Sequence, residues 1–267
     1  MVPLFGLIIA LYAWPVINIL WLGVSDPELG LQNYELLFTK SSLVKILWTT
    51  IRVCLITTLF SVVIGYLIAY TMVHLVGRER NWMLTLVLIS FWVSVLVRAF
   101  SWLTLLGRNG LVNAALVGSG LAEEPLSMIR NEFGVLIGMV HYMVPYAVLP
   151  LLANMHGIDH RIMDASRSLG AGPLLTFVRI YLPLTKPGVI ASSLLVFIIS
   201  LGFYVTPALL GGGRVLMVAE YVSVQILITV QWGVAAMLAT LLLSGVFALL
   251  YIMSRFMKIG EVFGARP

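Results

Sequence analysis

Four polar residues recur at helical spacing in an otherwise apolar stretch of the sequence: Ser90, Ser94, Arg98 and Ser101. If the stretch is one continuous helix, this spacing places all four on the same face. Such a stripe, with a cation in it, could line a pathway for a polar or charged solute. In the alternative interpretation, Arg98 extends toward the end of the helix or pairs with an acid. The candidate acids are Glu123, Glu124 and Glu132.

The sequence offers no credible catalytic or metal-binding set. His156 and His160 are four residues apart, but Gly157 lies between them and no third ligand is near, so a loop cap is favoured over a metal pair. A Gly-x-x-x-x-Gly-Lys-Ser/Thr sequence is absent, so we do not expect this chain to cradle ATP phosphates. We predict no catalytic residue, no metal site and no cofactor in this chain.

The composition indicates a membrane protein. Of the 267 residues, 61% are hydrophobic and only 10% are charged, and the mean hydropathy is +1.05. A soluble domain carries about a quarter charged residues, so a soluble enzyme and a nucleic-acid-binding protein are both excluded. The isoelectric point near 9.5 is therefore a signal of membrane topology. The single Cys54 excludes an internal disulfide.

Long stretches with few or no charges predict the elements that must position these residues. A membrane-spanning helix needs about 20 apolar residues, and six stretches satisfy this length. They are 1–25, 53–77, 81–106, 133–158, 187–213 and 221–254. We predict an all-α, polytopic membrane protein with six transmembrane helices in a single domain over residues 1–267. A short helix is expected at 111–116, in the loop 107–131.

Charge predicts the orientation of these spans. With both termini in the cytoplasm, the cytoplasmic segments hold nine of the 16 basic residues, and the outer segments hold seven of the 11 acidic residues. The opposite topology would break the positive-inside rule. We expect a multi-pass chain with both termini cytoplasmic; the resemblance described below implies a bacterial inner membrane. At the C-terminal end, the charges used here are Arg255, Lys258, Glu261 and Arg266.

The cytoplasmic segment 157–186 is too polar to span a membrane and contains signals for two short helices. Asp159 is a suitable N-cap for a helix from about His160 to Leu169, and Gly170 is a natural residue just beyond its end. Pro173 starts a second helix that reaches about Tyr181. An apolar face is expected on the first helix from Ile162, Ala165 and Leu169. An exposed apolar face on a helical hairpin marks a binding partner.

This hairpin carries a spaced pattern that resembles the EAA loop of ABC importer permeases. The family pattern is Glu-Ala-Ala, three residues, Gly, nine residues, then Ile-x-Leu-Pro, and this sequence matches its spacing without a gap. Asp164 stands in place of Glu, and Ser166 in place of the second Ala. The matching residues are Asp164, Ala165, Ser166, Gly170, Ile180, Leu182 and Pro183.

The resemblance implies a transport subunit that acts with partners. A second homologous permease, two ATPase subunits that bind ATP and Mg, and a periplasmic substrate-binding protein would complete the importer. The first helix of the hairpin would insert into a groove of the ATPase, with Asp164 paired to a basic residue, Ala165 allowing close approach and Gly170 making the turn. The expected surroundings are a lipid bilayer, and no nucleic acid is involved.

Within that family the chain is similar to the PotB-like permeases of spermidine/putrescine importers. Segments around Phe91-Trp92, Gly110-Leu111 and Gly202–Gly212 carry this similarity. The candidate pathway residues are polar or aromatic residues of the predicted spans. They are Trp92, Ser94, Arg98, Ser101, Trp102, Tyr142, Tyr146, Phe203, Tyr204 and Thr206.

The sequence leaves the substrate open. Aromatic faces suit a cationic polyamine, but no Asp or Glu lies in the core of any predicted span, and Pro207 stands where some polyamine permeases carry an acid. Arg98 suits an opine, an amino-acid derivative or an organic anion instead. A secondary transporter is the more distant alternative, since the sequence shows no inverted repeat and the hairpin would be unexplained.

Overall fold

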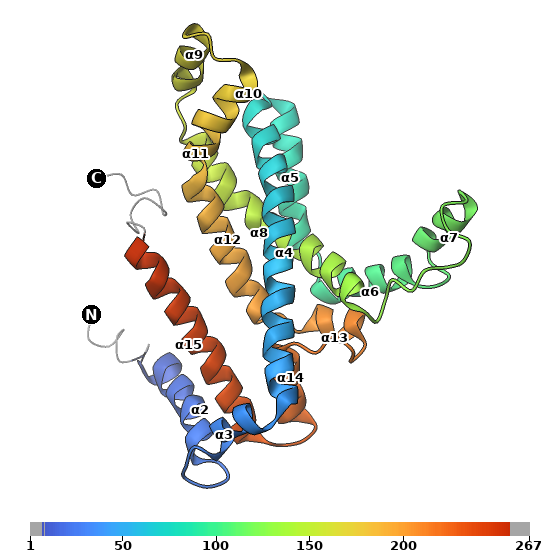
Figure 1. Ribbon diagram of the computed structural model, residues 1–267, viewed down its shortest axis with the longest axis vertical. Helices are drawn as coiled ribbons and strands as arrows, with labels where there is room; N and C mark the ends of the chain where they lie inside the picture. Colours follow the sequence, from blue (N-terminus) through green and yellow to red (C-terminus); the bar gives the residue numbers. More distant parts are fainter. Residues whose placement is uncertain (1–6, 8, 257–267) are drawn as a thin grey trace.

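The structure is a computed structural model that describes residues 7 and 9–256, and the described residues form helices and no strand. Part of the first predicted span and the charges Lys258, Glu261 and Arg266 lie outside the described residues. Figure 1 shows a narrow bundle with short helices at both ends. The all-α class predicted from the apolar stretches is confirmed.

Two long helices form the centre of the bundle. Helix α4 runs from Ser41 to His74, and α8 runs from Glu132 to His156. Their buried residues recur every three or four positions, as helix packing requires. In α4 this face includes Val53, Cys54, Thr57, Ser61, Gly65, Ala69 and Met72. In α8 it includes Val135, Met139, Met143, Ala147, Leu151 and Met155.

Local signals fix where α8 begins. The side chain of Asn131 accepts a hydrogen bond from the backbone N–H of Gly134 at 3.0 Å, so Asn131 is the N-cap. Helix α12, Lys186–Leu201, packs against both α4 and α8 and completes a three-helix core. Buried Val196 of α12 contacts a cluster with Val62, Met143 and Ala147.

Helices α2 and α15 form a separate pair at the side of this core. Helix α2, Trp14–Ser25, continues a π-helical turn over Ile9–Ala13 and packs along α15, Trp232–Phe256. Figure 1 shows the two helices side by side, with α15 inclined to the nearly vertical α4. The short helices α3, Gln32–Thr39, and α14, Val218–Leu227, connect this pair to the core at one end of the molecule.

The predicted span 81–106 is not one helix. Helix α5, Arg78–Trp92, ends before Val93, and α6, Val95–Leu106, leaves it at a bend of 98°. Figure 1 shows α6 and then α7, Leu111–Gly118, projecting away from α4 and α8. The short helix expected at 111–116 is therefore present, but the polar stripe of Ser90, Ser94, Arg98 and Ser101 is not on one helix face.

Two further predicted spans are also divided. The helix expected over 187–213 ends at Leu201, and α13, Val205–Gly211, follows as a separate element. The stretch 221–254 is divided between α14 and α15. The span expected over 53–77 begins earlier, at Ser41. These breaks were not predicted from the sequence, because a stretch without charged residues does not show where a helix ends.

Three described helices, α4, α8 and α15, are long and apolar enough to cross a membrane. Two bent pairs bring this number to as many as five: α5 with the segment Val95–Gly118, and Pro173–Leu184 with α12, which is bent by 57°. Helix α2 belongs to a shorter apolar segment, Ala10–Ser25. The described residues therefore support three to five spans.

Gly65 sets the distance between α4 and α8. A Cβ atom at Gly65 would lie 2.8 Å from the Cβ atom of Ala147, which is too close without a backbone shift. We expect Gly65→Val to lower the free energy of unfolding by about 1–3 kcal/mol, because overpacking a tight contact strains it. Thermal unfolding in detergent measures this effect.

Gly245→Val on α15 is the matched control, because a Cβ atom there meets no atom within 4 Å. We expect this variant to change stability by less than about 0.5 kcal/mol, as for most substitutions without close neighbours. Equal losses in the two variants would show that α4 and α8 do not depend on this close approach.

Candidate functional site

The break between α5 and α6 is occupied by the side chain of Arg98. Its Nη2 atom donates to the backbone carbonyl of Ser90 at 2.5 Å and to that of Val93 at 2.7 Å, and its Nε atom donates to Val93 at 3.3 Å. The guanidinium carbon also lies 4.5 Å from the ring centre of Tyr142 on α8. Arg98 therefore contacts α5 and α8 from its place on α6.

Aromatic side chains surround this position. The rings of Tyr142 and Tyr146 are stacked, with their centres 5.7 Å apart and their hydroxyl oxygens 3.4 Å apart. Phe203, from the segment between α12 and α13, lies 4.5 Å from Tyr142, and Phe91 of α5 lies 4.9 Å from Tyr146. We call Phe91, Arg98, Trp102, His141, Tyr142, Tyr146 and Phe203 the aromatic cluster.

Trp102 and His141 make a second link between α6 and α8. The indole Nε1 of Trp102 donates to Nδ1 of His141 at 3.1 Å, and the two rings meet edge to face. Because the indole nitrogen can only donate, Nδ1 of His141 is the acceptor and its proton is on Nε2. Arg98 and Trp102 are one helical turn apart and hold consecutive residues of α8.

The structure brings together five of the ten residues expected in the pathway: Arg98, Trp102, Tyr142, Tyr146 and Phe203. Trp92 is 90% exposed at the end of α5, and Tyr204 is 48% exposed. Ser94 is exposed in the break, and exposed Ser101 donates to the carbonyl of Val97. Thr206 is buried where α13 packs closely against Gly138.

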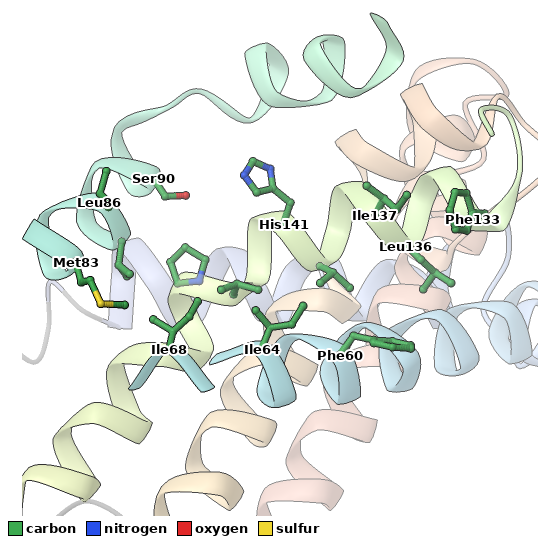
Figure 2. A pocket seen from close by; sticks show the side chains of 14 residues that line it. Phe60, Ile64, Ile68, Met83, Leu86, Ser90, Phe133, Leu136, Ile137 and His141 are labelled. Carbon is green, nitrogen blue, oxygen red and sulfur yellow. The ribbon is translucent and has the colours of Figure 1, made fainter. Parts of the chain in front are cut away.

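A cavity of about 720 Å³ lies beside the cluster, between α4, α5 and α8. Its wall is apolar apart from Ser90 and His141, which Figure 2 shows on opposite sides, one on α5 and one on α8. Ile64 and Ile68 of α4 and Met83 of α5 are typical of the remaining lining. Such a lining favours apolar contents and offers little to a charged solute.

Two acidic side chains of the bundle are engaged or buried. Glu132 at the start of α8 forms an ion pair with Arg52 of α4, so in the structure it is not the acid that pairs with Arg98, as one alternative held. Glu220 on α14 is only 8% exposed, and burial raises the pKa of its carboxyl to about 7 against a smaller lowering by the Met217 backbone. Neither acid provides a free carboxylate at the cluster.

The polar segment 157–186 forms the two expected short helices, which Figure 1 places at the end of the bundle opposite α13 and α14. Helix α9 runs from His160 to Ser168, and the side chain of Asp159 accepts from the Arg161 backbone N–H at 2.9 Å. The predicted N-cap is therefore confirmed. Helix α10, Pro173–Thr176, continues into a π-helical turn, Phe177–Tyr181, and then into α11, Leu182–Leu184.

Gly170 makes the turn between α9 and α10. Its φ of +85° is in the left-handed region, which favours glycine. Ser166 is buried, and its hydroxyl lies 2.9 Å from that of Thr176, which ties the two helices together. Asp164 and Ala165 are exposed, and Ile162 and Leu169 expose 43% and 89% of their surface. The predicted apolar face of α9 thus has no partner within the described residues.

The remaining residues of the spaced pattern follow α10. Ile180 is half-buried against the end of α4 and α8, while Leu182 is 39% exposed and Pro183 is exposed. Among the described residues, no three His, Cys, Asp or Glu side chains are grouped so that they could hold a metal ion. The hairpin is therefore a helical feature with exposed side chains at the end of the bundle.

Residues 61–258 match the family of binding-protein-dependent transport system inner membrane components. This match covers most of the chain and includes the second part of α4, all of α8 and the hairpin. The chain belongs to this family. It is a permease subunit of an ABC importer, and its homologues are transport components rather than enzymes.

The permease is similar in sequence to two spermidine/putrescine transport system permeases. It is 33% identical to the spermidine/putrescine transport system permease protein PotB of Haemophilus influenzae over 202 residues, which are 76% of this chain and 70% of that protein. It is 32% identical to PotB of Escherichia coli over 209 residues, which are 78% of this chain and 76% of that protein.

The fold of the permease matches that of a solved importer. A bacterial ABC transporter involved in the import of the acidic polysaccharide alginate has a chain with a TM-score of 0.73, at 16% identity, over 95% of this chain and 93% of that chain. The same kind of transporter in complex with an alginate pentasaccharide-bound periplasmic protein gives a TM-score of 0.75, at 16% identity, over 94% and 90% of the two chains. These likenesses concern the fold alone.

An aromatic contact between the hairpin and α4 was not found from the sequence. Tyr70 of α4 meets Phe177 and Tyr181 edge to face, with ring centres 5.6 and 5.4 Å apart. The hydroxyl of Tyr66 lies 3.1 Å from that of Thr185, just before α12. The permease thus joins its hairpin to the central helices through rings that looked like ordinary apolar residues in the sequence.

The link between Trp102 and His141 is testable by stability. Trp102→Phe keeps a ring beside His141 but removes the Nε1 donor, so we expect the free energy of unfolding to fall by about 0.5–1.5 kcal/mol. His141→Phe should cost a similar amount. The double variant should lose no more than the larger single loss, because both remove the same bond. Denaturant unfolding in detergent provides the measurement.

Trp92→Phe is the control, since Trp92 is 90% exposed and outside the aromatic cluster. We expect it to alter stability by less than about 0.5 kcal/mol. Strictly additive losses in the Trp102 and His141 double variant would contradict a bond between these two side chains.

Proposed function

We propose that this permease forms a translocation pathway with a second homologous permease, in a complex with two ATPase subunits and a periplasmic substrate-binding protein. The membership of the binding-protein-dependent family supports this arrangement. In the proposal, residues 1–267 form one transmembrane domain with six spans, and both termini are cytoplasmic. ATP and Mg are bound by the ATPase subunits, since the sequence offers no phosphate-binding loop.

The proposed substrate is a polyamine. The observation that carries this proposal is the 31–33% identity to several spermidine/putrescine permeases over most of the chain. A polyamine is a flexible cation, and aromatic faces attract cations without a carboxylate. Trp92 and Tyr204 are exposed aromatic residues flanking the aromatic cluster, so their rings are accessible to a passing ammonium group.

A second substrate class has one specific observation in its favour. Arg98 is a cation beside the proposed pathway, and it would attract the carboxylate of an opine, an amino-acid derivative or another organic anion. The same transport machinery would serve either class. The two proposals differ in the sign of the charge that stimulates the complex, which can be measured directly.

Substrate-stimulated ATP hydrolysis by the full complex tests the proposed substrate. We expect putrescine or spermidine, added with the binding protein to the complex in lipid nanodiscs, to raise the rate of ATP hydrolysis. Opines, amino-acid derivatives and organic anions should leave it at the basal rate. The opposite pattern would overturn the polyamine proposal and favour the anionic class.

Tyr204 offers a matched pair of variants for the same assay. Tyr204→Phe keeps the aromatic face, whereas Tyr204→Leu removes it. Because a desolvated cation–π contact contributes up to about 2 kcal/mol, we expect Tyr204→Leu to raise the half-maximal polyamine concentration by about tenfold. Tyr204→Phe should stay close to the unaltered complex.

In the proposed coupling mechanism, α9 inserts into a groove of an ATPase subunit. The exposed apolar face of Ile162, Ala165 and Leu169 supplies the contact area, and exposed Asp164 supplies the charge. The bond between Ser166 and Thr176 and the aromatic contacts of Tyr181 with Tyr70 make the hairpin and the end of α4 one stiff unit. Closure of the ATPase pair would move this unit as a rigid body.

Gly170 and Gly172 give a test of that mechanism within the same turn. A Cβ atom at either residue meets no atom within 4 Å, but only Gly170 has a positive φ. We expect Gly170→Val to misdirect α9, because a left-handed conformation costs a branched residue about 1–2 kcal/mol or more. ATP hydrolysis should then continue while polyamine uptake falls.

Gly172→Val is the control, because Gly172 has an extended backbone with φ −67° and ψ 163° that valine adopts readily. Uptake into proteoliposomes and ATP hydrolysis are measured together, and their ratio reports the coupling. Uptake at the normal rate in Gly170→Val would contradict the role of this turn in coupling.

A further inference from the structure

The end of α5 leaves several carbonyl groups without their ordinary helical partners. In an uninterrupted helix, the carbonyl of Ser90 would accept from the N–H of Ser94, and that of Val93 from the N–H of Val97. Neither of these two bonds is present across the break between Trp92 and Val95. Within a membrane such carbonyls must find another donor, because lipid offers none.

Arg98 donates to these same two carbonyls. Its Nη2 atom reaches Ser90 and Val93, and Nε adds a longer bond to Val93. No proline or glycine lies between Ser90 and Arg98 to account for the break. A side chain that takes over the carbonyls of the helical ladder is a recognised cause of a sharp bend.

We propose that Arg98 is a positioning residue: it replaces two of the lost backbone hydrogen bonds and fixes α6 against α5 and α8, and it does not bind the substrate. The face of its guanidinium rests on Tyr142, 4.5 Å from the ring centre, which fixes the guanidinium on the α8 side as well. One turn later, Trp102 bonds to His141. Arg98 and Trp102 therefore hold α6 against Tyr142 and His141, which are consecutive residues of α8.

This role changes what Arg98 means for the substrate. A guanidinium that donates to carbonyl oxygens and lies over a tyrosine ring is neutralised in part by their partial negative charges. It then presents less positive potential to a passing ammonium group than a free arginine would. The argument for an anionic substrate rests on a free Arg98, so it loses its basis if Arg98 is a positioning residue.

The distance between α5 and α6 tests the proposal without any substrate. Thr85 on α5 and Thr104 on α6 are exposed and suit spin labels after substitution by cysteine, while native Cys54 is fully buried. In the assembled complex we expect one narrow distance distribution with Arg98. Arg98→Met keeps a flexible, unbranched side chain but has no donor, so we expect a second, broader distance population.

Arg98→Gln keeps a hydrogen-bond donor but removes the positive charge, so it separates the effects of the two. Its amide nitrogen stands where Nε of Arg98 does, so it can still donate to the carbonyl of Val93, although it is too short to reach Ser90 and the cation is gone. We expect this variant to keep more of the narrow distance population than Arg98→Met. Its half-maximal polyamine concentration should stay within about twofold, whereas Arg98→Met should lower the maximal stimulated rate by about tenfold.

Two results would overturn the proposal. One is an unchanged distance distribution in Arg98→Met. The other is an unchanged distribution in Arg98→Gln together with a change of about tenfold or more in the half-maximal substrate concentration, which identifies a ligand. If Arg98→Met does not assemble, Arg98→Gln alone decides between the two roles. The kinetic comparison rests on the proposed function, whereas the distances between the spin labels do not. If polyamines fail to stimulate the unaltered complex, that result counts only against the proposed substrate.

Discussion

The need to satisfy backbone hydrogen bonds in apolar surroundings governs this molecule. Helices α4 and α15, which contain no proline, meet it within themselves. The break between α5 and α6 is the place where the helical ladder fails, and a charged side chain restores it there. Charge is scarce in this sequence, so a cation placed at two orphaned carbonyls indicates that the bend itself matters. The aromatic cluster lies at that bend, so the broken backbone hydrogen bonds and the proposed pathway are in the same place.

Packing connects the two ends of the molecule. The hairpin is joined to the end of α4 by Tyr70, Phe177 and Tyr181. Helix α4 then follows α8 closely, with Gly65 against Ala147, and α8 carries Tyr142 and His141 to the contacts with α6. Close-packed helices move as units rather than deforming. A displacement of the hairpin would therefore reach α6 through a chain of direct contacts, and this continuity gives the coupling proposal its structural basis.

The sequence predicted local features better than long-range ones. Asp159 and Gly170 were found because caps and left-handed turns have strong residue preferences that act over a few positions. The break after Trp92 was missed because neither proline nor glycine marks it, and because its cause lies at Arg98 and Tyr142. The four-residue polar stripe was consequently assigned to a helix that does not exist. Tyr66, Tyr70 and Tyr181 were also missed, since a tyrosine in an apolar run gives no sign of the ring it will meet.

The bend also explains how an arginine and a cationic substrate can share one region. In a straight helix Arg98 would project into the pathway and repel a polyamine, and a polyamine permease would then need acids nearby. Two acids are already engaged, because Glu132 pairs with Arg52 and Glu220 is buried. Once Arg98 turns back onto the carbonyls of Ser90 and Val93, the compensation is already present in the backbone. The accessible aromatic faces of Trp92 and Tyr204 then remain as the groups that a cation would meet.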